Sequence, residues 1–538
     1  MAETRRYESA GTTNPLVQRA YDAALVLTVI ALPFSNFLMS QGAFFMLLAW
    51  TLDRWKNGPI FRNRGWKFWQ SQLTFWAVLA LFSWLLMGQL WTTDLSNGWN
   101  ALRIQLPLLA FPLVLITGRW NFEHGVRLVR SALAISIIAA CIAVLWTGYQ
   151  HDDPLHAREW SPFISHIRFS LMIALTWAWW FWRFIRNRST SAAWTWAALT
   201  VFGGWVIWKT AAITGLLMIP IAGAFVLWME GLGGPSPQIP KVRASLKVIG
   251  ILAVISMGIG AWNLRPTPPA DFEMLHATDL GETYQHFPTR CLRENGTPVW
   301  VNIAWGEMES SWDAISAIPF RGPDGRNQEL KMTLIRFLAS KGLTKDAAGV
   351  HSLKAAEIQL VESGIPSILE LQHHGLRRRW DIVQFEIANW LDGGDPSGHS
   401  LVQRFAFLNA AFHIYHAHPV FGVGTGDLNR EFAAAYEAID SPLQLPFRLR
   451  AHNQYLTYLI SGGPIALVLW LAVLIAFYSS TTAIPERGAA LLFLLILCLS
   501  CLSEDTLETQ AGVTFAGFFI GLFGRRMQRK IPSPRASD

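Results

Sequence analysis

The residues of this chain with the clearest chemical potential are His452-Asn453-Gln454-Tyr455-Leu456, where a long polar segment runs back into an apolar one. Histidine is the side chain that changes charge closest to neutral pH. Here it starts a predicted helix, and the dipole at a helix N-terminus favours the neutral imidazole, which is the form that a general base needs. The alternative interpretation is an interfacial histidine that only caps a membrane span.

A second notable stretch is His418-Pro419-Val420-Phe421-Gly422-Val423-Gly424-Thr425-Gly426-Asp427. Glycines at alternate positions permit a tight turn with positive φ, and Asp427 is placed to cap a helix over 428–438. A glycine turn that opens a helix can present amide groups to a phosphate. However, no Gly-Lys-Ser/Thr follows and no strand precedes it, which excludes a nucleotide loop. Taken alone, the stretch is more typical of a structural turn.

The composition places these residues in a membrane protein. Hydrophobic residues make up 52% of the chain and charged residues 15%, there are 27 Trp, and the mean hydropathy is +0.27, which argues against a soluble domain of this length. The first apolar run lacks a small-residue cleavage site after it, so we interpret it as a retained span. We predict about twelve spans. Their centres lie near residues 28, 44, 81, 108, 139, 174, 200, 220, 256, 468, 496 and 517.

The orientation follows from the Lys and Arg residues of the short loops. When twelve spans are counted, the basic segments all fall on one side, which is then the cytoplasm, and both termini lie there. These segments are 54–67, 119–130, 183–188, 241–247 and 525–530. The net charge of +7 therefore reflects loops that face anionic membrane lipids, and no nucleic-acid partner is expected. Cys141, Cys498 and Cys501 lie in predicted spans and Cys291 stands alone outside them, so no disulfide framework is implied.

These features predict an all-α polytopic membrane protein with one large external domain between spans nine and ten. The expected division is an N-terminal membrane domain (1–264), the external domain (265–452), C-terminal membrane helices (453–524) and a basic cytoplasmic tail (525–538). Within the external domain, 265–375 is predicted to be a small, mostly helical domain with some β-structure near Val299–Ile303. Helices are also expected at 330–341, 355–362, 379–391 and 402–416, the last two in a distinct region over 376–452.

Taken together, the chain resembles the O-antigen ligase family, also called the O-antigen ligase/polymerase superfamily. Arg404, the stretch from His418 to Asp427, His452 to Leu456, Leu459 and Gly463 occur in that family's order and spacing. The number of spans and the position of the external loop are similar as well. The segment 265–375 is larger than the usual loop and is interpreted as an insertion. The chain departs from the family's pattern at Ser461, Pro464 and Ala466. These residues lie deeper in span ten, so the departures affect the packing of that helix more than the chemistry.

The resemblance implies a metal-independent, inverting glycosyltransferase of the membrane-embedded C type, without a cofactor. Its donor would be a glycan on undecaprenyl diphosphate at the periplasmic face of the bacterial inner membrane. Its acceptor would be lipid A-core or another glycan, and its other partners membrane lipids. His452 would be the general base, with Asn453 orienting the imidazole or a sugar, and Gly424, Gly426 and Asp427 would belong to the substrate site.

Four cations are candidates for binding the diphosphate, whose negative charge increases as the glycosidic bond breaks. Arg404 matches the family's position and is the first choice, because an arginine can bind phosphate through two donors. Lys209 stands where the family more often carries an arginine. Arg168 lies at the outer start of span six, close to hydrocarbon, and Arg450 precedes His452 by two residues. For each of them, snorkelling to lipid headgroups is the alternative.

Two other kinds of function stay open at this point, one within the superfamily and one outside it. Within the superfamily, the chain could be an O-antigen or exopolysaccharide polymerase, or a protein O-oligosaccharyltransferase, because the motifs overlap. From a different class, it could be a transporter of lipid-linked glycans. A transporter is expected to show paired repeats or broken helices with ionisable residues near the middle of the membrane. The charges here cluster at the outer face, which favours an enzyme.

Overall fold

The computed structural model describes residues 14–58, 66–150, 160–187, 190–210, 212–233, 272–290, 292–373, 375–482, 484 and 486–526. The chain divides into two compact units. The first comprises Met1–Ile251, Phe407–Ile439 and Leu449–Asp538, and the second comprises Leu252–Ala406 and Asp440–Arg448. The predicted external domain, 265–452, coincides with neither unit, and the predicted domain limits stay predictions.

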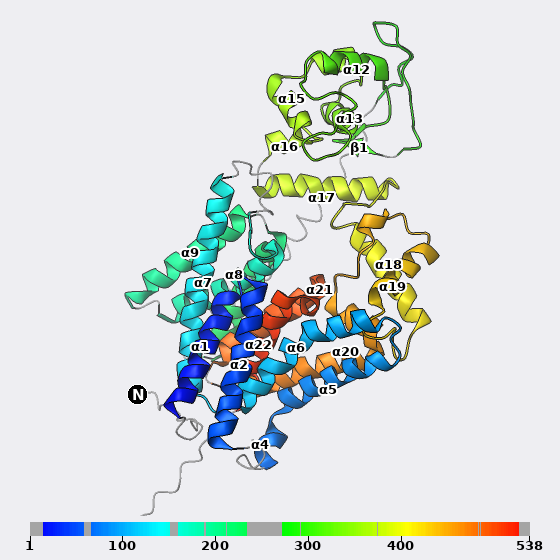
Figure 1. Cartoon of the computed structure of the whole chain (residues 1–538). Helices are drawn as coiled ribbons and strands as arrows, with labels where there is room; N and C mark the ends of the chain where they lie inside the picture. Colours follow the sequence, from blue (N-terminus) through cyan, green and yellow to red (C-terminus); the bar gives the residue numbers. More distant parts are fainter. Residues whose placement is uncertain are drawn as a thin grey trace, which may run out of the picture. The chain divides into compact units, whose positions relative to one another are not determined.

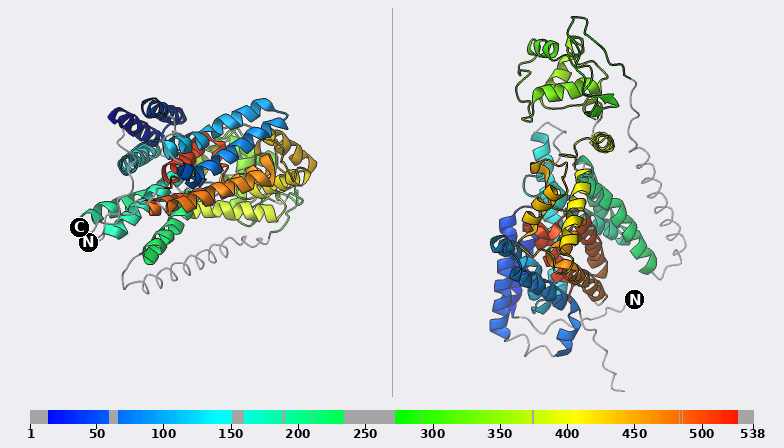
Figure 2. Two further views of the ribbon diagram at one scale, coloured as in Figure 1. Left: turned by 90° about the horizontal axis from the view of Figure 1, so that it is seen from below. Right: turned by 90° about the vertical axis from the view of Figure 1, so that its right-hand side faces the viewer.

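The first unit is a bundle of helices (Figure 1, Figure 2). Its helices before the second unit are α1 (Pro15–Ala31), α2 (Asn36–Asn57), α4 (Trp66–Ser71), α5 (Leu73–Met87), η1 (Gly88–Leu90), α6 (Leu95–Thr117), α7 (Phe122–Gln150), α8 (His166–Asn187), α9 (Ala192–Lys209) and α10 (Ile213–Gly233). Those after it are α19 (Leu428–Ala438), α20 (Gln454–Thr481), α21 (Arg487–Ser503), η4 (Thr506–Glu508) and α22 (Gln510–Phe523). Helix α18 (Gln403–Ala417) begins in the second unit and ends in the first.

The prediction of a helical, multi-pass membrane protein is confirmed at this level. Among the described residues, four helical stretches are long and apolar enough to cross a membrane, namely Leu73–Leu90, Leu95–Thr117, Phe122–Gln150 and Gln454–Thr481. Thr214–Glu230, Arg487–Ser503 and Gln510–Phe523 are shorter apolar helices. Each predicted span centre falls inside a helix except that near residue 256, which lies outside the described residues. The number of twelve spans stays a prediction.

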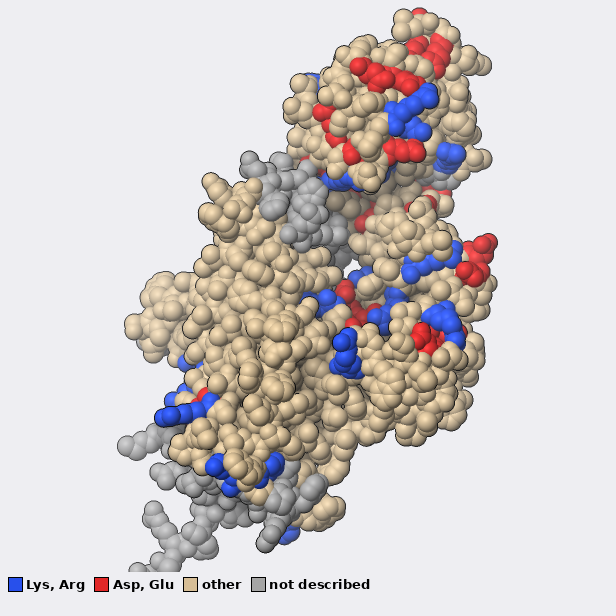
Figure 3. All heavy atoms as spheres, in the orientation of Figure 1, with Lys and Arg blue, Asp and Glu red and all other residues tan. Residues whose placement is uncertain are grey.

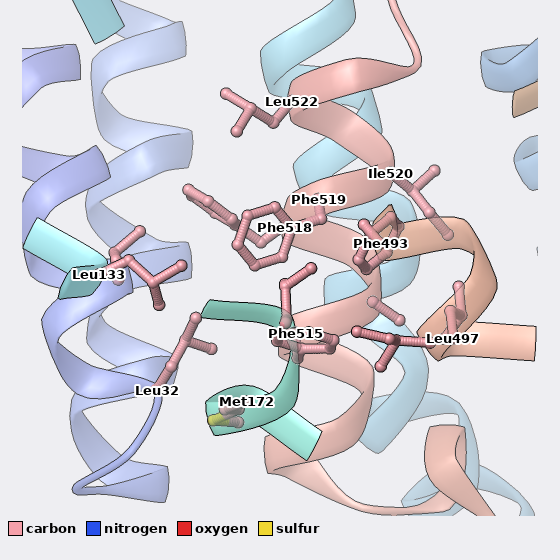
Figure 4. Packing of buried hydrophobic residues seen from close by; sticks show 14 of the residues in the cluster. Leu32, Leu133, Met172, Phe493, Leu497, Phe515, Phe518, Phe519, Ile520 and Leu522 are labelled. Atoms are coloured by element: carbon pink, nitrogen blue, oxygen red, sulfur yellow. The ribbon is translucent and has the colours of Figure 1, made fainter. Parts of the chain in front are cut away.

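The core of this unit forms where α22 packs against α6. Two glycines of α22 permit the close approach. A Cβ atom on Gly517 would lie 2.5 Å from the carbonyl oxygen of Pro107, and one on Gly521 would lie 2.7 Å from that of Phe111. Aromatic rings of α22 and Phe493 of α21 fill the adjoining space, together with Leu32 directly after α1, Leu133 of α7 and Met172 of α8 (Figure 4). Pro107 and Pro112 lie inside α6 without ending it.

The predicted cytoplasmic segment 119–130 contacts two neighbouring segments in the described part of the chain. The amide of Arg119, after α6, donates to Asp53 at the end of α2 over 3.0 Å, and Arg130 forms an ion pair with Glu486 at 3.0 Å. In the space-filling view, Lys and Arg gather near the lower left of the bundle, and a broad surface without charged side chains lies above them on that side (Figure 3). This arrangement agrees with the basic loops facing one side of a membrane.

The second unit contains a small domain with its own apolar core, which includes Trp312, Leu334 and Phe337. Its elements are β1 (Arg293–Glu294), β2 (Thr297–Pro298), α12 (Trp305–Asp313), α13 (Leu330–Ser340), α14 (Ala347–His351), α15 (Ala355–Glu362), α16 (Leu369–Gln372), α17 (Gly375–Leu391) and η3 (Leu445–Phe447). The predicted helices are found within a few residues. The predicted β run Val299–Ile303 is wrong, because the hairpin strands precede it and Ile303 makes only isolated bridges to Gln285 and Lys345.

Candidate active site

His452 lies in a strained backbone conformation, directly before helix α20. Its φ is +48°, in the left-handed region that residues other than glycine rarely adopt. Asn453 is the N-cap and Gln454 the first helical residue. The sequence predicted that His452 starts this helix, whereas His452 precedes it by two residues. Its Nδ1 lies 3.6 Å from Oε2 of Glu504, and its ring lies 5.6 Å from that of Phe407. Strain at a position of this kind is typical of functional sites.

The side chain of Asn453 serves the local fold. Its Oδ1 accepts hydrogen bonds from the amides of Tyr455 and Leu456 at 3.0 and 3.1 Å, which satisfies donors at the helix N-terminus. Its Nδ2 donates to the carbonyl oxygen of Leu502 at 3.1 Å. These contacts hold the position that follows His452. A direct contact of Asn453 with a sugar or with the imidazole stays a prediction.

The short loop between α21 and α22 holds the start of α20 through several polar contacts. Asp505 Oδ1 accepts from the amide of Asn453 at 3.0 Å and from Thr457 Oγ1 at 2.7 Å. The amide of Leu507 donates to Gln454 Oε1 at 2.7 Å. The loop therefore positions both the histidine and its carboxylate neighbour, Glu504.

Sequence reasoning missed this loop, although a signal was present. Glu504, Asp505 and Glu508 lie between two apolar segments, and a loop between spans eleven and twelve returns to the side of the membrane where His452 is expected. Ionisable groups at such a place are candidates for a functional site.

Arg450 and Glu508 form an ion pair beside this loop. Arg450 Nη1 lies 3.4 Å from Glu508 Oε2, and the side chain of Arg450 is 30% exposed against 8% for Glu508. Glu508 Oε1 also accepts from Gln105 Nε2 at 3.0 Å and from Gln454 Nε2 at 3.4 Å. Burial raises the pKa of Glu508, while the charge of Arg450 opposes that rise.

Arg168, in the first turn of α8, is near the same acidic loop. Its guanidinium interacts electrostatically with Glu504 and Asp505, and its Nε is buried without a hydrogen-bond partner in the described part of the chain. Arg168 lines a small pocket together with Ser500, Thr506 and Gly512 and with apolar residues of α8, α21 and α22. The structure thus brings Arg168, Arg450 and His452 around one acidic loop.

The other two predicted cations lie at helix ends. Arg404 lies in the first turn of α18 and belongs to the second unit, whereas the loop around His452 belongs to the first. Lys209 is the last residue of α9 and is exposed. Their roles as diphosphate ligands stay predictions.

The glycine stretch packs against the neighbouring helices. The amides of Val423 and Gly424 donate to the carbonyl oxygens of Ile460 and Ser461, both at 2.9 Å. Gly424 has a φ of +95°, and a Cβ on Gly426 would lie 2.1 Å from the Asp94 carbonyl oxygen. Both glycines are buried. Their contacts are with the protein itself, and substrate binding by them stays a prediction.

Asp427 connects this stretch to the start of α6. It occupies the cap position of α19, but its side chain makes no capping hydrogen bond there. Instead, its carboxylate accepts from the amides of Thr93 and Asp94, both at 2.8 Å. Burial alone would raise the pKa of Asp427, but these hydrogen bonds outweigh it and lower the pKa.

Comparison with known proteins identifies the class. Residues 358–471 match the family model described as O-antigen ligase. The matched region contains Arg404, the glycine stretch and His452, so the resemblance to the O-antigen ligase family is confirmed over these residues. A search of curated proteins finds no match. The chain is therefore a helical membrane protein with a region that matches the O-antigen ligase family.

Proposed function

We propose that this protein is an O-antigen ligase-like glycosyltransferase at the periplasmic face of the inner membrane. It transfers a glycan from undecaprenyl diphosphate to a hydroxyl group of lipid A-core. The observation that carries the proposal is the placement of His452, strained and beside Glu504, within the matched ligase region. Arg168 and Arg450 stand around the same loop as cations.

In this mechanism, His452 accepts the proton of the acceptor hydroxyl as the oxygen attacks the anomeric carbon. With Nδ1 facing Glu504, Nε2 is the nitrogen that takes the proton. The carboxylate of Glu504 then stabilises the imidazolium that forms, as an acid partner of a catalytic histidine does. The bond from the anomeric carbon to the phosphate oxygen breaks, and both electrons leave with the lipid diphosphate. Attack from the face opposite the leaving group inverts the anomeric centre.

The leaving group needs cations more than it needs an acid. A diphosphate carries its charge without protonation, so electrostatic stabilisation by positioned guanidinium groups favours bond cleavage. Arg168 is suited to this role because its Nε has no hydrogen-bond partner among the described residues and the group is partly buried, where charge interactions are stronger than in water. Arg450 and Arg404 are the further candidates, followed by Lys209.

A transfer assay with purified protein in nanodiscs tests the proposal. We expect an undecaprenyl-diphosphate-linked glycan to be consumed and the sugar to appear on lipid A-core. Absence of transfer to any glycan acceptor, together with movement of the intact donor across the bilayer of sealed proteoliposomes, would instead indicate a transporter. A deletion strain distinguishes ligase from polymerase. A ligase mutant loses all long-chain lipopolysaccharide, whereas a polymerase mutant keeps core that bears one repeat unit.

A further inference from the structure

Glu508 is a buried carboxylate that the proposed mechanism does not use. Its ion pair in the described part of the chain is with Arg450, at 3.4 Å, and its remaining contacts are amide groups of Gln105 and Gln454. A buried charge is tolerated only while it is paired. Glu508 therefore depends on Arg450 for its negative charge.

Arg450 is less buried than its partner, since 30% of its side chain is exposed against 8% for Glu508. It precedes His452 by two residues and lies beside the loop that holds the histidine. An anionic ligand that approaches His452 can thus reach Arg450 from solvent. Glu508 stays buried when the arginine side chain turns toward that ligand. The two partners would be separated by binding of a strong anion.

We propose that Glu508 forms its ion pair with Arg450 while no donor is bound. When the donor's diphosphate binds Arg450 in its place, Glu508 takes up a proton from solvent. This rests on the proposed function, because it requires a lipid diphosphate at the site. Before binding, the pair is neutral. After binding, Arg450 faces the diphosphate, and the buried carboxyl group is neutral because its Oε2 carries the proton.

The neighbours of Glu508 favour this exchange. From α6, Gln105 contributes an uncharged amide, whose Oε1 accepts from the hydroxyl of Tyr458 on α20 at 3.1 Å. Asp505, the residue before η4, adds negative charge, which raises the pKa of Glu508 in addition to the larger effect of burial. Thus the cation that keeps Glu508 ionised comes from the loop before α20. After its withdrawal, the uncharged amides of Gln105 and Gln454 still donate to the carboxylate, but burial, the largest influence on its pKa, and Asp505 favour the protonated form.

Binding of a lipid diphosphate as a function of pH tests the inference. The probe is undecaprenyl-diphospho-N-acetylglucosamine, titrated calorimetrically into the full chain in nanodiscs between about pH 6 and pH 8. With uptake of one proton, affinity should strengthen on acidification by up to about tenfold per pH unit. Glu508→Gln should lose this slope and bind more tightly than the wild type at pH 8. Glu437→Gln, at an exposed position of α19, should keep the wild-type slope.

Titrations of the wild type in buffers of different ionisation enthalpy count the protons directly and need no variant. Zero protons taken up, or a slope that persists in Glu508→Gln, would overturn the inference. Arg450→Ala separates it from the proposed function. If this variant binds the probe as tightly as the wild type, Arg450 is not a diphosphate ligand and the inference fails, while the transfer assay decides the glycosyltransferase activity independently.

Discussion

The backbone amide of Val423 donates a hydrogen bond over 2.9 Å to the carbonyl oxygen of Ile460. Ile460 lies four residues before Pro464, which has no N–H to offer that carbonyl within α20. The helix is kinked there, since Gly462 and Gly463 have non-helical backbone angles. The glycine stretch thus supplies the donor that the proline removes, which explains why a membrane helix can be broken at this point.

The glycine stretch should be needed for stability. Gly424→Ala introduces a Cβ at a φ of +95° and only 2.4 Å from Thr92 Oγ1. Gly393→Ala is the matched control, because Gly393 has a φ of +81° and nothing within 4 Å of the added Cβ. In both variants, the left-handed backbone lowers the free energy of unfolding by about 1–2 kcal/mol. We expect a clearly larger fall in the melting temperature for Gly424→Ala. Equal melting temperatures with selective loss of donor binding would instead support a direct substrate role.

Much of the fold could be predicted from the sequence, because its signals are local. Apolar runs predict membrane helices, and helix 428–438 was predicted with its observed ends from the glycine turn before it. The site was only partly predictable. His452 could be recognised from its position and motif, whereas Glu504 became its neighbour only through the fold, since the two are far apart along the chain. Likewise, the carboxylate of Asp427 binds Thr93 and Asp94, which no local pattern indicates.

The orientation of the loops can be tested with phosphatase fusions. The side of His452 should be periplasmic, so fusions after Pro266 and after Glu508 should be active. A fusion after Ser480, at the other end of α20, should be inactive because the basic loops place that end in the cytoplasm. Activity at both Ser480 and Glu508 would contradict the topology.

Arg404→Lys tests whether this residue binds the diphosphate through two donors. The substitution keeps the charge but loses the planar fork of the guanidinium group, so transfer should fall at unchanged protein level. Arg377→Lys, on an exposed part of α17, is the control and should leave transfer unchanged. Wild-type turnover in Arg404→Lys would exclude bidentate binding by Arg404.

Glu504→Gln tests the partner of His452. Without the carboxylate, the imidazolium that forms during transfer is stabilised less, so kcat should fall while donor affinity changes little. When two residues act as a unit, the effects of replacing them on the rate do not add. We therefore expect Glu504→Gln to cause no further loss in a protein that already carries His452→Ala. A full additional loss in the double variant would show that Glu504 acts independently of the histidine.

The central prediction concerns His452 itself. His452→Ala should lower the rate of transfer by about 10²- to 10⁴-fold while donor binding is retained, because a base contributes mainly to the transition state. His452→Asn is a second variant that tolerates the positive φ at this position, so equal losses in both separate lost chemistry from backbone strain. His416→Ala, at the exposed end of α18, is the control.

The dependence of the rate on pH distinguishes the two roles open to this histidine. A general base must be neutral, so the wild-type kcat should fall as the pH is lowered and the imidazole becomes charged. If His452 were instead a cation that holds phosphate, activity would rise on acidification and His452→Arg would retain function. Measuring kcat rather than donor affinity is essential here, because protonation of Glu508 is expected to strengthen binding over the same range. Robust transfer by His452→Ala would exclude both roles.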